Sequence, residues 1–368
     1  MANEKRKTVA LILSEKCNLN CVYCYEHTKN YQVMDIEIAK QALVDEFRKT
    51  KGYDGVEIHF HGGEPFMVFP LIKEISEWIW NQRFETPYIL FATCNGTMLT
   101  PEIKDWLTQN KERFYVCLSL DGTKEMHDTN RCGSYDKIDK SFFYNNWPDQ
   151  GVKMTISPQT VVNLAEGVIE VAEFGFVVNA NLAMGMDWNH KELQEVYANQ
   201  LKILADYYLN HPELPVCSIL DMYLGMINKN DMEPLTKICG TGTSMVAYGP
   251  DGRKYPCHTF MPSVNFGESD NDAIWEAVKL STYNDPMCEN CLLRHQCSTC
   301  YGMNYYRCGN LGKRAEDYCK MNKIRAKAIS YFYGKMLLTP EKYQKRLGKE
   351  NLDRIANGVL LIQKELSI

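Results

Sequence analysis

The stretch that decides the fold is Val9-Ala-Leu-Ile-Leu-Ser-Glu-Lys-Cys17-Asn-Leu-Asn-Cys21-Val-Tyr-Cys24. Its apolar start is typical of a buried strand. Three cysteines follow with the spacing C-x3-C-x2-C, which chance would give about 0.02 times in a chain of this cysteine content. The segment predicts a strand that ends in a loop of three thiolate ligands.

Strand-like and helix-like segments alternate along the first two hundred residues. Strands are expected at Val9–Leu13, Val56–His61, Tyr88–Thr93, Phe114–Leu120, Val152–Ser157 and Val177–Leu182. Helices are expected at Ile36–Lys49, Leu71–Phe84, Pro101–Asn110 and Leu164–Phe174. Six alternations predict an α/β protein with a parallel sheet, either open or curled into a barrel, whose chemistry lies at the carboxyl ends of its strands.

Composition excludes several classes of function. The 368 residues carry a formal net charge of -5, so no basic excess indicates a nucleic-acid partner. No apolar run is long enough for a membrane-spanning helix, and the N-terminus lacks a signal-peptide pattern. We therefore expect a cytoplasmic protein without a membrane partner, in which 15 cysteines are metal ligands, catalytic groups or core residues rather than disulfides.

Each of the first four strands is followed by a polar motif. The cysteine triad follows the first, His61-Gly-Gly-Glu-Pro65 the second, Cys94-Asn-Gly-Thr97 the third and Asp121-Gly122 the fourth. Glycine lets a backbone approach a ligand closely, and a fixed carboxylate can satisfy an ammonium group. Each motif alone is weak evidence, but their order along the chain predicts one composite site.

The triad admits two kinds of metal site. A structural zinc site needs four protein ligands, and only His27 is available nearby as a fourth. Three thiolates on one loop suit a four-iron cluster with one iron left open for a ligand.

These motifs together resemble the radical S-adenosylmethionine (SAM) superfamily, in which an aromatic residue, here Tyr23, precedes the last cysteine of the triad. The resemblance implies a partial (β/α)6 TIM-like barrel, with a 4Fe-4S cluster on Cys17, Cys21 and Cys24. It also implies cleavage of SAM to methionine and a 5'-deoxyadenosyl radical that abstracts a hydrogen atom. The cofactor-binding residues that it implies are Tyr23, Gly62, Gly63, Glu64, Asn95, Ser119, Asp121 and Arg131.

A second set of cysteines has the spacing Cys288-x2-Cys291-x5-Cys297-x2-Cys300. It resembles the SPASM extension, which binds two auxiliary clusters and would bring the total to three 4Fe-4S clusters. The last step is C-x2-C here, whereas the family usually has C-x3-C. The resemblance implies a farther cluster on Cys288, Cys291, Cys297 and Cys319, and a nearer cluster on Cys239, Cys257 and Cys300. Cys308 or an open iron completes the nearer cluster, and two zinc ribbons are the alternative to both.

The expected division of the chain has three parts. Residues 1–230 form the radical SAM barrel, 231–325 the SPASM domain, and 326–368 a C-terminal helical segment. A hairpin is expected around Asp251-Gly252.

The resemblance implies a peptide or protein substrate and an external electron donor such as flavodoxin or ferredoxin. The expected reaction is maturation of a ribosomally made peptide through a thioether or carbon-carbon crosslink or a similar oxidation. The alternative is an anaerobic sulfatase-maturing enzyme, although His258 stands where those enzymes carry an aspartate base. We expect no peptide-recognition domain before Cys17.

Two side chains are candidates for substrate chemistry. His258 could act as a base, and Cys132 could donate a hydrogen atom. An alternative of another class is a multi-cluster electron carrier, against which the SAM-binding motifs argue.

Overall fold

The computed structural model describes residues 5–227, 239–264, 270–280, 286–297, 299–348 and 352–366. The chain forms two compact units, which we describe separately. The first comprises Met1–Ser119, Arg131–Gly151 and Lys237–Leu280. The second comprises Leu120–Asn130, Val152–Thr236 and Ser281–Ile368. No helix of the described residues is long and apolar enough to cross a bilayer.

A six-stranded sheet in the order β4-β3-β2-β1-β7-β8 forms the core of the first unit. All neighbouring strands are parallel except β7 and β8, which form the expected antiparallel hairpin. The apolar run of β1 is almost fully buried, which is why it lies in the middle of the sheet. The strands are β1 Arg6–Ser14, β2 Gly55–Gly62, β3 Tyr88–Cys94, β4 Phe114–Leu118, β7 Met245–Tyr248 and β8 Lys254–Tyr255.

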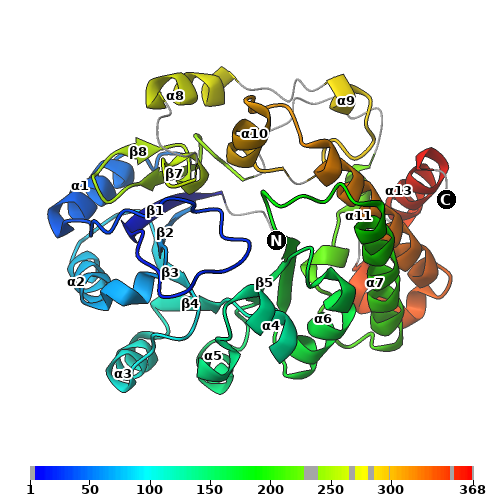
Figure 1. The fold of residues 1–368 in the computed structure, drawn as a ribbon, viewed down its shortest axis with the longest axis horizontal. Helices are drawn as coiled ribbons and strands as arrows, with labels where there is room; N and C mark the ends of the chain where they lie inside the picture. The colour runs from blue at the N-terminus through cyan, green and yellow to red at the C-terminus, as the bar shows by residue number, and fades with distance from the viewer. Residues whose placement is uncertain are drawn as a thin grey trace. The chain divides into compact units, whose positions relative to one another are not determined.

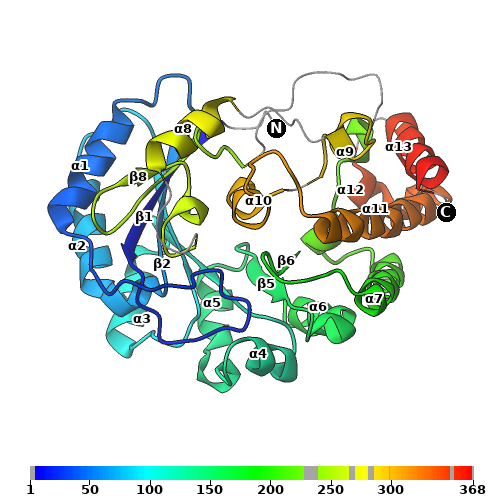
Figure 2. The same cartoon turned by 45° about the horizontal axis from the view of Figure 1, so that its top comes forward.

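Three crossover helices, α1 to α3, lie on the same side of strands β1 to β4 in both views (Figure 1, Figure 2). Asp35 and Thr100 cap the N-termini of α1 and α3 with their side-chain oxygens. The helices of the first unit are α1 Ile36–Phe47, α2 Phe69–Trp80, α3 Pro101–Asn110, α5 Lys140–Asn146 and α8 Asn271–Leu280. The predicted helices that correspond to α1, α2 and α3 are confirmed to within a few residues.

The second unit has a two-stranded parallel sheet, β5 Val152–Ile156 with β6 Val178–Leu182. Long helix α11 packs against α7 and α13, as Figure 2 shows. The helices of this unit are α4 Lys124–Asn130, α6 Leu164–Glu173, α7 Lys191–Asn210, α9 Pro286–Glu289, α10 Tyr301–Cys308, α11 Glu316–Leu337, α12 Gln344–Leu347 and α13 Leu352–Glu365. All six predicted strands and four predicted helices are present, which confirms the α/β class.

The pairing of β7 with β1 has no counterpart in the predicted division of the chain. It extends the parallel sheet by residues that come more than a hundred positions after β4 in the sequence. The compact units follow this pairing, with residues 239–264 and 270–280 in the first unit.

Glu46 at the end of α1 joins this late hairpin to the start of the sheet. Its side chain is 1% exposed and forms ion pairs with Lys7 at 2.7 Å and Lys254 at 2.7 Å. The Tyr248 hydroxyl also donates to it at 2.8 Å. Burial would raise the pKa of Glu46, but the bonds from Lys254, Lys7 and Tyr248 outweigh burial and lower the pKa to about 2.

Replacing Glu46 by Gln should lower the free energy of unfolding by about 3 kcal/mol at neutral pH, because Lys7 would lose its buried partner. Glu46 titrates near 4.5 when unfolded and near 2 when folded. The contribution of Glu46 to the free energy of unfolding is therefore fully present above about pH 4.5 and is lost as the pH falls towards 2. Urea unfolding across this range measures it.

Glu37→Gln on the same helix is the matched control, because its carboxylate is 74% exposed and pairs only with Lys40 among the ion pairs described. Equal losses of stability in the two variants would contradict the role given to Glu46.

Candidate active site and iron-sulfur ligands

The ends of β1 and β2 are held together by hydrogen bonds that continue past the strands. Gly63 N–H donates to the Ser14 carbonyl at 3.0 Å, and Glu64 N–H donates to the Lys16 carbonyl at 2.7 Å. Gly62 has a φ of 143°, and a Cβ at Gly62 or Gly63 would overlap the carbonyl oxygens of Ser14 or Lys16. These glycines therefore allow two backbones to meet, a role that the sequence analysis did not predict for them.

The three cysteines of the triad are half-buried on the loop that leaves β1. Cys24 N–H donates to the Cys21 carbonyl at 3.0 Å and tightens the loop into a turn. Asn18, within the loop, donates to Thr97 at 2.8 Å and accepts from the Asn95 amide at 2.9 Å. The loop is thus fixed to the carboxyl end of β3 by side chains of the predicted Asn-Gly-Thr motif.

Glu64 lies buried between the ends of β2 and β3. Its two carboxylate oxygens accept the backbone N–H groups of Phe66 at 3.1 Å and Asn95 at 2.7 Å. Burial raises the pKa of Glu64 to about 7, while these N–H groups and the Arg131 guanidinium act in the opposite direction. Arg131 also stacks over the ring of Tyr23, with its guanidinium carbon 5.5 Å from the ring centroid.

These residues line one cavity of the first unit. It encloses about 770 Å³ of empty space, open solvent at its mouth included. The predicted residues on its wall are Cys17, Cys21, Tyr23, Cys24, Gly62, Gly63, Glu64, Asn95, Ser119 and Arg131. The carboxyl ends of parallel strands therefore meet here, as the alternation of strands and helices predicts.

The cavity also contains two charged residues that sequence reasoning missed, Glu26 and Lys29. Burial raises the pKa of Glu26 to about 7, and the Lys29 ammonium opposes that rise. Burial likewise raises the pKa of the Cys17 and Cys24 thiols, again opposed by Lys29. Charged residues at irregular spacing in a loop give no periodic signal, so only the folded loop identifies them.

His258 lies against the wall of this cavity. Its ring stacks on that of His61, with centroids 4.5 Å apart and an angle of 27° between the rings. Tyr25, also on the wall, lies 5.8 Å from His258 between ring centroids. Gly62 N–H donates to Nδ1 of His61 at 2.8 Å, so a neutral His61 ring carries its proton on Nε2. His61, the first residue of the predicted His61-Gly-Gly-Glu-Pro65 motif, thus lies on the cavity wall.

Asp121 and Cys132 make contacts that the sequence did not suggest. The fully buried Asp121 carboxylate accepts from Thr155 N–H at 2.8 Å and from the Asn130 amide at 3.2 Å, within the second unit. Cys132, with a φ of 55°, donates from Sγ to the Asn20 carbonyl at 2.8 Å. These contacts organise loops. The ribose contact of Asp121 and the hydrogen-donor role of Cys132 stay predictions.

Four cysteines of the second unit share one electrostatic environment. Burial raises the pKa of the Cys297 thiol to about 11, and the nearby thiols of Cys319, Cys291 and Cys288 add to the rise. The Arg314 guanidinium opposes it and donates to Sγ of Cys288 at 2.6 Å. The sequence grouped these four cysteines but missed Arg314, because one more arginine in a polar loop carries no spacing signal.

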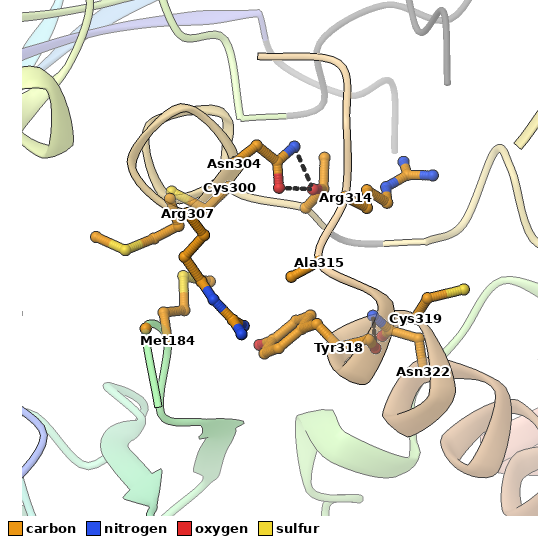
Figure 3. A pocket seen from close by; sticks show the side chains of 12 residues that line it. Met184, Cys300, Asn304, Arg307, Arg314, Ala315, Tyr318, Cys319 and Asn322 are labelled. Carbon is orange, nitrogen blue, oxygen red and sulfur yellow. Dashed lines mark hydrogen bonds between the residues drawn. The ribbon is translucent and has the colours of Figure 1, made fainter. Parts of the chain in front are cut away.

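A pocket of the second unit has Cys300 and Cys319 on its wall (Figure 3). The Cys319 side chain extends away from the centre of the pocket on the side to which Arg314 also points, and Cys300 lies on the opposite side. Cys300 is the N-cap residue of α10, and Cys308 is the last residue of that helix.

The remaining predicted ligands lie in the first unit. Cys239 is exposed in a turn, and Cys257 is buried with Sγ 3.0 Å from the Thr259 hydroxyl. In the described part of the chain, no three His, Cys, Asp or Glu side chains surround one point as the ligands of a single metal ion do. Cys94 and Cys117 are buried in strands β3 and β4.

The donor set of the first cavity fits an iron-sulfur cluster that carries SAM. Thiols are soft ligands for iron, the buried carboxylate suits an ammonium, and the guanidinium suits a carboxylate. The triad, Glu64 and Arg131 supply these groups around one space.

Comparison with known proteins gives the family. The family model of the Radical SAM superfamily matches residues 11–199. The radical SAM cyclopropyl synthase TigE of Paramaledivibacter caminithermalis is 23% identical over 359 residues, covering 87% of this chain and 73% of that protein. A cysteine-type anaerobic sulfatase-maturating enzyme of Clostridium perfringens is 23% identical over 278 residues, covering 67% and 73%.

Solved structures share the fold. The native protein anSMEcpe with bound AdoMet has a TM-score of 0.68 at 19% identity, covering 90% of this chain and 98% of that chain. Streptococcus suis SuiB bound to precursor peptide SuiA has a TM-score of 0.57 at 14% identity, covering 86% and 76%. Family membership implies SAM and a 4Fe-4S cluster, so a zinc-only triad and a pure electron carrier are set aside. The chain belongs to the radical SAM superfamily and is an enzyme.

Proposed function

We propose that this enzyme oxidatively modifies a peptide or protein, most specifically by maturing a ribosomally made peptide through a thioether or carbon-carbon crosslink. The observation that carries the proposal is the stacking of His258 on His61 at the wall of the SAM cavity. A group able to accept a proton there can act on a substrate whose C–H bond is directed into the same cavity.

The proposed roles of the cavity residues, and of Asp121, Cys132 and His258, follow from their chemistry. Bound SAM and its cluster supply the radical that abstracts hydrogen. Cys17, Cys21 and Cys24 hold the cluster, Glu64 accepts the amino group of the methionine part, and Arg131 pairs with its carboxylate. Asn95, Gly62, Gly63 and Ser119 offer backbone and side-chain polar groups, Tyr23 supports Arg131, and Asp121 is assigned to the ribose. His258 takes a substrate proton, and Cys132 returns a hydrogen atom where the reaction needs one.

Relatives support a peptide substrate. SuiB was solved with a precursor peptide, and anSMEcpe was also solved with the Cp18Cys peptide. The alternative function is sulfatase maturation, favoured by the relative of that name in Clostridium perfringens. We prefer crosslinking because His258 replaces the aspartate expected of sulfatase maturases.

Two auxiliary clusters complete the proposal. Cys288, Cys291, Cys297 and Cys319 hold the farther one, and Cys239, Cys257 and Cys300, with Cys308 or an open iron, hold the nearer one. Residues 231–325 then act as the auxiliary domain between the barrel, 1–230, and the helical segment, 326–368. Flavodoxin or ferredoxin supplies electrons, and the reducing cytoplasm suits 15 cysteines that are all free of disulfides.

Replacing Cys17, Cys21 and Cys24 together by Ala should remove one cluster's worth of iron and abolish formation of 5'-deoxyadenosine, because these thiolates are the proposed ligands. Iron analysis and product chromatography after anaerobic incubation with SAM and dithionite measure both. The double variant of Cys117 and Cys217 to Ala is the control, since both thiols are buried elsewhere. Cleavage retained in the triple variant would refute the assignment.

Glu64→Gln should weaken SAM binding by about one to two decades, because a charge-assisted bond contributes about 1.5–3 kcal/mol. All clusters should remain. The Gln amide would also face one of the N–H groups that Glu64 now accepts, so stability should fall by about 1–3 kcal/mol. Equilibrium binding and urea unfolding measure the two effects.

Glu57→Gln, on strand β2 just before the turn that carries Glu64, is the matched control. If Glu64→Gln binds SAM as tightly as this control, the glycine-glycine-glutamate turn has only a structural role.

His258→Ala should keep iron content and substrate-free formation of 5'-deoxyadenosine but lose modified peptide. The control is His59→Ala, which should keep the product. His59 lies two residues before His61 on β2. The assay uses peptides encoded beside the gene, with mass spectrometry as readout. A wild-type yield in His258→Ala would leave His258 a packing residue.

The same spectra decide between the two reactions. Loss of two hydrogens supports a crosslink, whereas conversion of a cysteine to formylglycine, with loss of sulfur, would favour the sulfatase-maturing alternative.

A further inference from the structure

Arg314 lies in the loop between α10 and α11 and is buried, with 8% of its surface exposed. Its Nη1 donates to Sγ of Cys288, which is itself 5% exposed. A guanidinium is always charged and is costly to bury unless an anionic partner compensates it. A cysteine sulfur that ligates iron carries negative charge. The bond to Sγ of Cys288 therefore places this guanidinium beside a proposed cluster ligand.

Arg314 lies near more than one of these cysteines. Its guanidinium contacts Cys288, and Arg314 and Cys319 line the same pocket. Both cysteines belong to the set that we assign to the farther auxiliary cluster. Figure 3 shows Arg314 and Cys319 extending towards the same side of the pocket wall.

The neighbouring arginine is arranged differently. Arg307, on the same pocket wall, donates to both carboxylate oxygens of Asp317 at 2.9 and 3.1 Å. This ion pair neutralises Arg307 locally. Of these two arginines, Arg314 is the one whose described hydrogen bond goes to a cysteine.

We propose that Arg314 is a positioning residue that raises the reduction potential of the farther auxiliary cluster and so makes that cluster the better electron acceptor. Reduction adds one electron, and hence one negative charge, to a four-iron cluster whose thiolate ligands already make it anionic. A buried positive charge that donates a hydrogen bond to a ligand sulfur stabilises the reduced state more than the oxidised state. This inference rests on the cluster assigned under the proposed function.

The test compares two substitutions of Arg314 in the full chain that carries Ala at Cys17, Cys21 and Cys24, so that only auxiliary clusters contribute. Arg314→Gln keeps a hydrogen-bond donor but removes the charge. It should lower the ratio of reduced to oxidised cluster at a fixed potential by about tenfold. For a one-electron couple this corresponds to a midpoint potential about 59 mV lower. Arg314→Lys keeps the charge and should change the ratio less than about threefold. Dithionite titration followed by electron paramagnetic resonance measures the midpoint.

Arg294→Gln is the matched control. Arg294 lies between Cys291 and Cys297, in the segment between α9 and α10, and its guanidinium donates to the Glu289 carbonyl at 3.2 Å. The same loss of charge there should change the ratio less than about threefold. Equal shifts in Arg294→Gln and Arg314→Gln would overturn the proposal, because the effect would then be one of overall charge.

Iron content distinguishes a failure of the cluster assignment from a failure of the role given to Arg314. If Cys288→Ala with Cys291→Ala removes no iron, the cluster assignment itself fails. If iron is retained in Arg314→Gln and the midpoint is unchanged, only the role of Arg314 is refuted. If Arg314→Gln loses iron, Arg314→Lys becomes the deciding variant. A midpoint potential close to that of the chain with native Arg314 supports the role of the charge. A change of about tenfold in the ratio of reduced to oxidised cluster overturns it.

Discussion

The close contact of two backbones past the ends of β1 and β2 is the constraint on which the site depends. Gly63 and Glu64 donate to the carbonyls of Ser14 and Lys16, immediately before the first cysteine. Because both glycines lack a Cβ, the cysteine loop and the carboxylate of Glu64 lie on the wall of one cavity. Any side chain there would separate them. The same arrangement continues across the sheet, where Ser119 N–H donates to the Cys94 carbonyl beyond β4.

Burial gives this cavity its electrostatic character. It raises the pKa values of Glu64, Cys17 and Cys24, so each group favours its neutral form until a cationic partner is present. Arg131 and Lys29 act in the opposite direction but do not cancel the effect. Under the proposed assignment of Cys17 and Cys24 as cluster ligands, loading the cluster is therefore coupled to loss of protons.

The sequence predicted what local pattern controls and missed what only folding brings together. The strands, the crossover helices and the motifs at strand ends follow from apolar runs and fixed spacings, and the structure has them. The pairing of β7 with β1 depends on four residues with no pattern of their own, and the hydrogen bonds of Asp121 depend on Thr155 from another strand. The stacking of His258 on His61 joins residues almost two hundred positions apart.

The spacing of the shortened C-x2-C step does not by itself determine where its two sulfur atoms point. Cys297 and Cys300 are three positions apart, yet Cys300 begins α10 while Cys297 ends the preceding turn. Burial raises the pKa of Tyr318, and the thiols of Cys300 and Cys297 add to that rise. Cys319, next to Tyr318, extends from the opposite side of the pocket wall to Cys300 (Figure 3). The start of a helix, more than the number of intervening residues, thus determines the direction in which Cys300 can offer its sulfur.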